Sequence, residues 1–349
     1  MYNYKMSEKI QVGIVGAAGY TGAELLRILA LHPFFEVTYL AGLSNVGNKI
    51  SQIFPSLALF YPELAVQSFR ASALDGLDLV FLALPHGESA KIIEPIAESN
   101  SVVVDLSADF RLSNLRDYET FYGGTHPAPH LLDKSVLAIP EINRDQITKD
   151  KIIAVAGCYV TCATLGLYPL AINNLIETDG VIVNGASGVS GAGKSPKEST
   201  NYSTVNENYC AYSLMSHRHT PEMEQLTGLK ILFTPHLVPM TRGILTTCYA
   251  RPKENQLGTP IQELIELYRD CYQDEQFVQV VDEPPSTKHT LGTNNIIISV
   301  QYDPRTNWIL VLSALDNLVK GASGQAVQAA NIAFGLTENA GLDQLALYP

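Results

Sequence analysis

The sequence predicts a two-domain α/β protein. A Rossmann-type doubly wound parallel sheet comes first, and an α+β domain with a mostly antiparallel sheet follows. At 349 residues the chain exceeds the usual size of a single hydrophobic core. Strand and helix signals alternate from residue 9 to about 155, whereas the strand-like runs beyond have few helices between them. We place the dinucleotide-binding domain at residues 1–156 and 321–349, and the domain for catalysis and oligomerisation at residues 157–320.

Short apolar runs, each followed by a turn or a helical pattern, predict the elements of the first domain. Ile10 to Val15 reads as a buried strand, and residues 23–31 after it carry apolar side chains at helical spacing. Ile152 to Ala156 is another such strand, and residues 159–174 after it read as an amphipathic helix. Further strands are expected at residues 36–43, 77–84 and 101–106.

Strand-like runs also predict the second sheet. A helix of small residues is expected at 321–336, with Val327, Ala330 and Phe334 on one face, so we expect it to return to the first domain. The strands of the second sheet are expected at residues 180–186, 229–236, 244–251, 276–281, 294–302 and 308–315.

A glycine loop connects the first strand to the first helix. Gly16, Gly19 and Gly22 are spaced three apart there, with Tyr20 and Thr21 between the last two. Glycine lets the backbone approach the pyrophosphate of a dinucleotide at a helix N-terminus, although a tight turn without a ligand would also use glycine. The strand–loop–helix context favours a cofactor site.

The end of the second strand indicates which cofactor binds. An NAD site would place an acidic residue there for the ribose 2′-hydroxyl, but this chain has Ser44 and Asn45, with Lys49 nearby. A hydroxyl, an amide and a cation suit a 2′-phosphate better. We therefore expect NADP(H).

Residues 188–195 match the nucleotide-hydrolase pattern G-x-x-x-x-G-K-[ST] letter for letter. In a nucleotide hydrolase this loop runs into a buried apolar helix, but here Pro196 follows at once and no apolar periodicity comes after it. ATP or GTP binding is therefore disfavoured. A flexible loop that passes a nicotinamide or an acyl phosphate explains the same residues better.

Cys158 is predicted to be a nucleophile. It follows Gly157 at the start of a helix, where unpaired N–H groups and the helix dipole favour a thiolate, so we expect it to titrate below about 8.5. The alternative is an inert buried thiol. We expect that role for the other four cysteines, Cys162, Cys210, Cys248 and Cys271.

One of His217 and His219 is the expected acid–base partner of Cys158. Two residues apart in extended chain, they would point to opposite sides. Thr220 looks like a helix N-cap and Pro221 like the first helical residue, which would commit His219 to the helix start and favours His217. A capping loop without catalysis is the alternative. No metal site is indicated, because no acidic or cysteine partner stands at ligand spacing.

Composition limits the partners. A net charge of −12 argues against nucleic acid and anionic membranes, so an anionic substrate must be held by local donors. Five cysteines without paired spacing, no apolar leader and no apolar run near 18 residues predict a cytoplasmic protein. The expected substrate-binding residues are Arg111, Lys194, Glu222 and Arg242.

Several segments together resemble the N-acetyl-γ-glutamyl-phosphate reductases, NADPH-dependent enzymes of arginine biosynthesis. The resemblance spans essentially the whole chain, and its most discriminating segments are AGCY at 156–159 and HRHTPE at 217–222. It implies that Cys158 is the nucleophile and that a histidine of HRHTPE is its partner. It also implies a homodimer or homotetramer. For the cofactor site it implies Pro85, His86, Ser187, Gly188, Gly191 and Asn317, besides the glycine loop and Ser44.

The implied reaction is reduction of an acyl phosphate to an aldehyde through a cysteine thioester. The aspartate-semialdehyde dehydrogenases are similar in plan, so reduction of another acyl phosphate such as aspartyl phosphate is an alternative. A Cys–His hydrolase or acyltransferase and a dinucleotide-sensing regulator remain alternatives from other classes.

Overall fold

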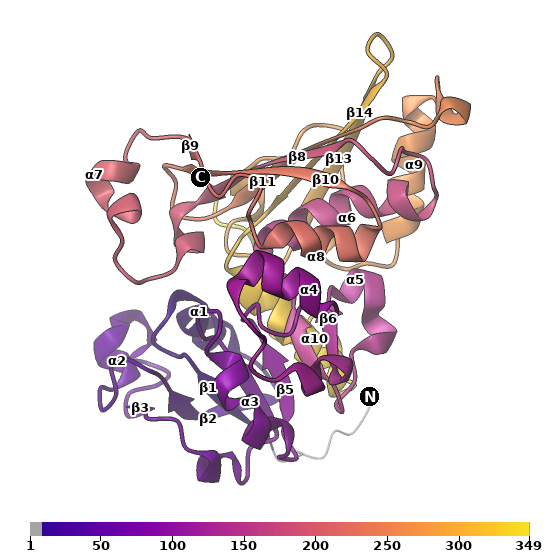
Figure 1. The fold of residues 1–349 in the computed structure, drawn as a ribbon. Helices are drawn as coiled ribbons and strands as arrows, with labels where there is room; N and C mark the ends of the chain where they lie inside the picture. The colour runs from indigo at the N-terminus through magenta and orange to yellow at the C-terminus, as the bar shows by residue number, and fades with distance from the viewer. Residues whose placement is uncertain (1–8, 349) are drawn as a thin grey trace, which may run out of the picture.

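The structure, a computed structural model, describes residues 9–348 and contains both expected sheets (Figure 1). The first sheet has seven strands in the order β3-β2-β1-β4-β5-β7-β6, and every neighbouring pair is parallel. Its strands are β1 (Ile10–Val15), β2 (Phe35–Ala41), β3 (Val66–Gln67), β4 (Leu79–Leu82), β5 (Val102–Asp105), β6 (Ser135–Ala138) and β7 (Ile152–Val155).

Burial on both faces explains why the central strands of this sheet read as continuous apolar runs. All four residues of β4, of β5 and of β7 are buried. The sequence missed β3 and β6, which are only two and four residues long and give little periodicity. The helices of this part of the chain are α1 (Tyr20–Leu29), α2 (Ile50–Ile53), α3 (Ser89–Ala97), α4 (Leu115–Tyr118) and α5 (Pro140–Asn143).

The second sheet also has seven strands, in the order β12-β13-β14-β11-β8-β10-β9. It is mixed but mostly antiparallel, as predicted; only the pairs β8–β10 and β12–β13 are parallel. Its strands are β8 (Val181–Gly188), β9 (Cys210–Ala211), β10 (Ile231–Val238), β11 (Ile244–Ala250), β12 (Val278–Val280), β13 (Ile296–Asp303) and β14 (Trp308–Leu315).

Helix α6 (Cys158–Ile172) joins the two domains. In Figure 1 it lies with α8 (His219–Thr227) on the side of the second sheet that faces the first domain. Between the sheet and the first domain, α6 is buried on nearly all sides, so it lacks the amphipathic pattern expected from the sequence. The sequence also missed α9 (Ile261–Tyr272), which buries Leu264, Ile265, Tyr268 and Tyr272 on one face.

The C-terminal helix α10 (Gly324–Ala333) returns to the first domain, as predicted. Val327 and Ala330 are fully buried in the core of the first domain. Phe334 packs against the same core, with its ring centroid 5.8 Å from that of Phe35.

The start of α8 differs from the prediction. The helix begins at His219, so Thr220 and Pro221 are its second and third residues and Arg218 occupies the N-cap position. Arg218 makes no side-chain capping bond; instead Nδ1 of His217 accepts the backbone N–H of His219 at 3.2 Å. His217, and not His219, is therefore the histidine whose side chain caps the start of the helix.

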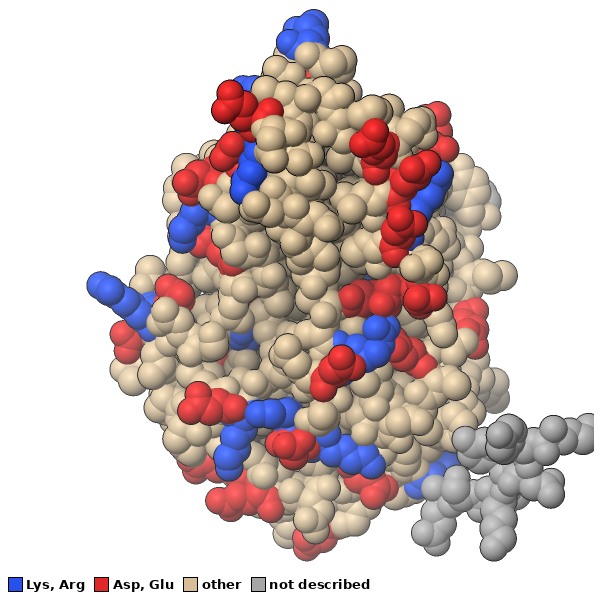
Figure 2. All heavy atoms as spheres, turned by 90° about the vertical axis from the view of Figure 1, so that its right-hand side faces the viewer, with Lys and Arg blue, Asp and Glu red and all other residues tan. Residues whose placement is uncertain are grey.

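Figure 2 shows how charged residues are distributed on one face of the protein. On the face drawn in Figure 2, Lys and Arg lie among Asp and Glu without a continuous basic area. Within residues 9–348, no helix combines the length and apolarity that crossing a membrane requires.

A buried ion pair holds the π-helical turn Val319–Ser323. Nζ of Lys320 lies 2.5 Å from Oε1 of Glu141 and 2.9 Å from Oε1 of Gln328, and the Lys320 and Glu141 side chains are fully buried. Burial opposes ionisation of Glu141, but the charge of Lys320 outweighs it and holds the pKa of Glu141 below its usual value.

Replacing Lys320 with methionine should destabilise the fold by about 3–5 kcal/mol, because Glu141 would keep a buried charge without a countercharge, although Gln328 would still donate to it. The double variant Lys320→Met/Glu141→Leu should recover most of that loss, since apolar groups then fill the site. Denaturant unfolding measures both, with exposed Arg305→Met as the control. Equal losses in the single and double variants would contradict the pairing argument.

Candidate active site

Cys158 is the first residue of α6 and lies directly beyond the carboxyl end of β7. Two glycines allow close packing around it. A Cβ added to Gly157 would lie 2.3 Å from Nε2 of His219, and one added to Gly321 would lie 2.7 Å from Cβ of Cys158. The His219 ring and the Val319–Ser323 turn therefore both approach the segment that carries the thiol.

The pKa of Cys158 is shifted upward, whereas the sequence suggested a downward shift. Burial raises the pKa of this thiol to about 11, although the backbone N–H of Tyr159 and the charge of Arg111 act against the rise. The helix-start effect is thus present but smaller than the cost of desolvating a thiolate. In the free site the thiol is protonated, and a base must remove its proton.

The two histidines lie together rather than on opposite sides, because the chain turns into α8 at this point. Their ring centroids are 4.7 Å apart. His217 packs edge-on against Tyr159, Tyr212 and Phe233, with centroid distances of 5.8, 5.5 and 5.1 Å.

His219 lies beside the turn that precedes Cys158. It lies against Gly157, and its Nδ1 is buried without a hydrogen-bond partner among the described residues. Burial lowers the pKa of His219 well below its usual value and that of His217 to about 2. Both rings are therefore neutral near pH 7, and the same burial makes each a weaker base than free imidazole.

Glu222 connects the segments around the thiol. It lies one turn after His219 in α8 and is fully buried. Its Oε2 accepts the N–H of Gly157 at 3.1 Å, and its Oε1 accepts from Tyr122 Oη at 2.9 Å and Arg111 Nη1 at 3.2 Å. The carboxylate thus fixes the turn that precedes Cys158.

Arg111 and Glu222, both expected to bind substrate, are paired with each other. Besides the contact with Glu222, Arg111 donates from Nη2 to the carbonyl of Leu106 at 2.9 Å. The geometry gives both residues a role in positioning the thiol loop, with Nε of Arg111 left without a partner among the described residues.

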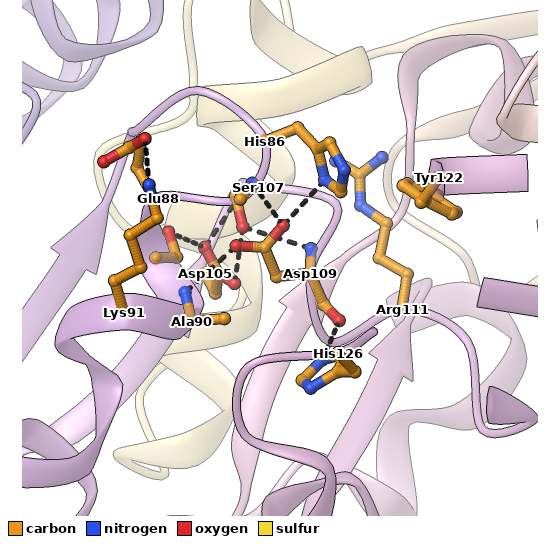
Figure 3. A network of polar contacts seen from close by, with 12 residues as sticks. His86, Glu88, Ala90, Lys91, Asp105, Ser107, Asp109, Arg111, Tyr122 and His126 are labelled. Atoms are coloured by element: carbon orange, nitrogen blue, oxygen red, sulfur yellow. Dashed lines mark hydrogen bonds and ion pairs between the residues drawn. The ribbon is translucent and has the colours of Figure 1, made fainter. Parts of the chain in front are cut away.

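A second polar network lies where β4 and β5 end (Figure 3). The Asp109 carboxylate lies 2.7 Å from Nδ1 of His86 and accepts the backbone N–H groups of Gly87 and Ala90 at 2.7 and 3.0 Å. The His86 ring lies 4.8 Å from that of Tyr122. The network therefore links the loop of Pro85 and His86 to the Glu222 cluster.

Asp105 adds a second buried carboxylate to this network. It is fully buried and accepts from the hydroxyls of Ser89 and Ser107 at 3.0 and 2.8 Å. Burial raises the pKa of Asp105 to about 6. Asp105 and Asp109 were not predicted as site residues. The signal that could have identified them is their position at the carboxyl end of a parallel strand, where ligands bind in open α/β sheets. No feature of the sequence pointed to Tyr122 as a site residue.

The glycine loop has the shape of a dinucleotide site. Gly16 has φ +99°, and a Cβ added there would lie 2.2 Å from the carbonyl oxygen of Ala83. A Cβ on Gly22 would lie 2.5 Å from the Gly16 oxygen, whereas Gly19 has more room. Helix α1 begins at Tyr20 and has no acidic residue in its first turn, so its N-terminus can receive a pyrophosphate.

A cleft of about 320 Å³ lies between Tyr20 and the segment after β8. Its lining includes Ser190, Lys194, Lys197 and Arg242. Its volume lies within the usual range for small-molecule sites, and its polar lining suits a phosphorylated ligand.

The residues expected near the nicotinamide meet beside this cleft. Asn317 donates from Nδ2 to Oγ of Ser190 at 2.9 Å and accepts the N–H of Gly243 at 2.8 Å. A Cβ on Gly191 would lie 3.1 Å from Oγ of Ser187, and one on Gly188 would lie 2.8 Å from backbone atoms of Thr241 and Arg242.

Lys194 and Arg242 reach the first domain. Lys194 donates to the carbonyl of Ala18 in the glycine loop at 3.2 Å and lies 4.3 Å from the centre of the Phe54 ring. A 3₁₀ turn (Glu198–Thr200) and the four-residue helix α7 (Tyr202–Val205) follow Lys194, not the long helix of a nucleotide hydrolase, in line with the prediction. Arg242 lies 2.8 Å from Oε2 of Glu24 in α1 and 3.6 Å from Oδ2 of Asp316.

The end of β2 leaves Ser44 exposed, as a 2′-phosphate contact would require. Lys49 lies 2.6 Å from Glu63, and both of these side chains are exposed. That pair must open, or be shared, for Lys49 to meet a phosphate.

The other four cysteines were expected to be buried and inert, and the structure agrees for three of them. Cys162 and Cys248 are fully buried and Cys271 is half-buried, but Cys210 is exposed in the short edge strand β9. The prediction of burial was wrong for Cys210. Among residues 9–348, no group of three His, Cys, Asp or Glu side chains is arranged to hold a metal ion.

Comparisons with known proteins agree with this arrangement. The NAD binding domain of the semialdehyde dehydrogenases matches residues 11–150, and their dimerisation domain matches residues 158–317. The fold is similar to that of aspartate semialdehyde dehydrogenase II from Vibrio cholerae complexed with ASA, with a TM-score of 0.71 and 20% identity over 94% of this chain and 99% of that one. The Candida albicans enzyme with NADP gives a TM-score of 0.70 at 16% identity, over 95% and 99%.

Relatives with higher sequence identity carry the name N-acetyl-gamma-glutamyl-phosphate reductase. The protein of that name from Geobacter sulfurreducens is 45% identical over 97% of this chain and all of its own. The one from Desulforudis audaxviator is 44% identical over 97% and 100%, and the one from Aquifex aeolicus 40% over 99% and 100%. The chain belongs to the N-acetyl-γ-glutamyl-phosphate reductase family.

Proposed function

We propose that this protein is a cytoplasmic oxidoreductase that converts N-acetyl-L-glutamyl 5-phosphate to N-acetyl-L-glutamate 5-semialdehyde with NADPH, in arginine biosynthesis. The observation that carries the proposal is the position of Cys158 at the start of α6, directly after Gly157, which the His219 ring approaches. The names of the relatives supply the acyl group.

The chemistry begins with the thiol. His219 takes the proton of Cys158, and the thiolate attacks the acyl carbon; the new C–S bond forms as the bond to the phosphate oxygen breaks and phosphate leaves. N–H groups at the start of α6, such as that of Tyr159, can stabilise the developing oxyanion. When bound, the dihydronicotinamide supplies the hydride that reduces the thioester, after which the C–S bond breaks and the aldehyde departs.

The proposal is tested in the reverse direction, by following NADP reduction with a semialdehyde and phosphate. N-acetylglutamate 5-semialdehyde should be oxidised in preference to aspartate semialdehyde, and the rate should require phosphate. Preference for aspartate semialdehyde would mean that the acyl group is wrong. NADP reduction without phosphate would mean that water, not phosphate, cleaves the thioester. Binding of NADPH without any NADP reduction would point to the sensor, and absence of NADPH binding would point to the hydrolase.

Cofactor choice gives a separate prediction. The Ser44→Asp variant should bind NADPH about tenfold or more weakly, because a carboxylate would lie beside the 2′-phosphate, and should bind NADH as before. Fluorescence titration with each cofactor measures this. The matched change Ser56→Asp, at an exposed position in the turn Pro55–Leu57, serves as the control. An unchanged preference would mean that the 2′-phosphate lies elsewhere.

We propose further that the protein is a homodimer. In Figure 1 no helix covers the face of β8, β10 and β11 that points away from the first domain. Apolar side chains on outward positions of that sheet are half-buried or exposed, and Leu232 is 46% exposed. A second copy would bury this face, which includes Ile182, Leu232, Leu245, Leu310 and Leu312.

Leu245→Arg should convert the dimer to a monomer, since a charge in the centre of an apolar interface would have no partner. Light scattering after size-exclusion chromatography measures the mass. Leu59→Arg, on an 87% exposed position of the first domain, should leave the mass unchanged. A variant at Leu245 that stays dimeric would place the interface on another face.

A further inference from the structure

The substrate of the proposed reaction carries a carboxylate that takes no part in the chemistry. A protein with net charge −12 must meet this anion with a local cation. Of the cations expected to bind substrate, Arg111 is paired with Glu222, and Arg242 is paired with Glu24 and Asp316. Lys194 is directed to the glycine loop by its bond to Ala18.

Arg218 is different, and the sequence did not single it out. It stands between His217 and His219, yet its side chain is exposed whereas both rings are largely buried. Within residues 9–348 its guanidinium makes no ion pair and no hydrogen bond to another side chain.

One aromatic contact places the guanidinium at the candidate site. Its central carbon lies 5.7 Å from the centre of the Tyr122 ring. Tyr122 donates to Glu222, which in turn accepts the N–H of Gly157, so only two hydrogen bonds separate the ring under Arg218 from the thiol loop. The charge of Arg218 also acts on His217 and His219, whose pKa values it helps to lower.

We infer that Arg218 binds the α-carboxylate of the acyl substrate and so contributes to its selection. This inference rests on the proposed function. A guanidinium offers a planar pair of donors that matches a carboxylate, and the face of Tyr122 limits its freedom before the ligand arrives.

The two anionic ends of the substrate can be told apart by position. Phosphate leaves the carbon that Cys158 attacks, so it must lie beside the start of α6. The carboxylate lies at the other end of the acyl chain, several bonds away. An exposed cation on the His219 side of the thiol loop suits the distant end.

The test compares wild type with Arg218→Gln in the reverse reaction, using N-acetylglutamate 5-semialdehyde and its α-carboxamide. The KM for the semialdehyde should rise by about 10- to 100-fold, the usual effect of losing a hydrogen-bonded charge pair. The KM values for phosphate and NADP should stay the same, and the preference of wild type for the acid over the amide should disappear. Arg218→Lys should restore part of the preference.

The control is Arg305→Gln, an exposed arginine at the turn between β13 and β14, which should match wild type. A rise in the KM for phosphate with the acid-over-amide preference intact would assign Arg218 to phosphate and overturn the inference. An Arg218→Gln enzyme with wild-type constants for every substrate would also overturn it. A wild type that does not oxidise the semialdehyde would instead refute the proposed function, and the inference would fall with it.

Discussion

Replacing Cys158 with alanine should lower turnover by about 10⁴-fold or more, because no other group can form the thioester. NADPH should still bind, since the glycine loop and the cleft are built from other residues. Stopped-flow measurement of the phosphate burst in the forward direction, with fluorescence titration of NADPH, separates the two effects. Loss of both would indicate that the substitution had disturbed the domain interface.

Cys162 provides the matched control. It lies one turn further along α6, fully buried, with Sγ 3.2 Å from the carbonyl of Ser313 and 3.3 Å from Oγ1 of Thr246. Cys162→Ala should retain turnover and lose a little stability from the small cavity. An active Cys158→Ala enzyme beside an inactive Cys162→Ala enzyme would mean that the nucleophile was assigned to the wrong thiol.

The rate at which Cys158 is alkylated should depend on pH. A pKa of about 11 keeps Cys158 protonated at pH 7 in the free enzyme, so its reaction with iodoacetamide should be slow there. The rate should rise with pH toward that value as the thiolate fraction grows. Rapid labelling of Cys158 at pH 7, ahead of exposed Cys210, would show that His219 already holds the proton in the free state.

Local sequence patterns predicted the fold well because they report on burial. The continuous apolar runs of β4 and β5, and the β7–Gly157–α6 succession, follow directly from a sheet covered on both faces. Helix α9 was missed although its apolar face is regular, because the strand-like runs around it suggested a nearly all-β region. Two-residue strands such as β3 and β9 carry no periodicity that could be recognised.

The site was predicted in its residue types but not in its pairings. Cys158, the histidines and the glycine loop are each marked by their neighbours in the sequence. The bond from Glu222 to Gly157 joins residues 65 positions apart, and the pair of Arg242 with Glu24 joins residues 218 apart. Such contacts depend on how α8 and α1 dock, so no local pattern could show that these charged residues are paired with one another.

The choice between the histidines changed for the same reason. His217 was favoured because Thr220 looked like the cap, but α8 starts at His219 and His217 itself accepts the first helical N–H. That bond and the surrounding aromatic rings occupy His217. We therefore infer that His219, whose Nε2 side meets Gly157, exchanges the proton with the thiol.

The His219→Asn variant should therefore lose about 10²-fold or more in the rate of thioester formation, the usual effect of removing a general acid–base group. Its KM for NADPH should not change, and single-turnover release of phosphate measures the step. His217→Asn is the matched control, because asparagine can still accept the N–H of His219, and it should keep most of its turnover while unfolding at a slightly lower temperature. A larger loss of rate in His217→Asn would return the proton transfer to His217. Small, equal losses would move it to another base, and His236, whose Nδ1 has no partner among the described residues, would be examined next.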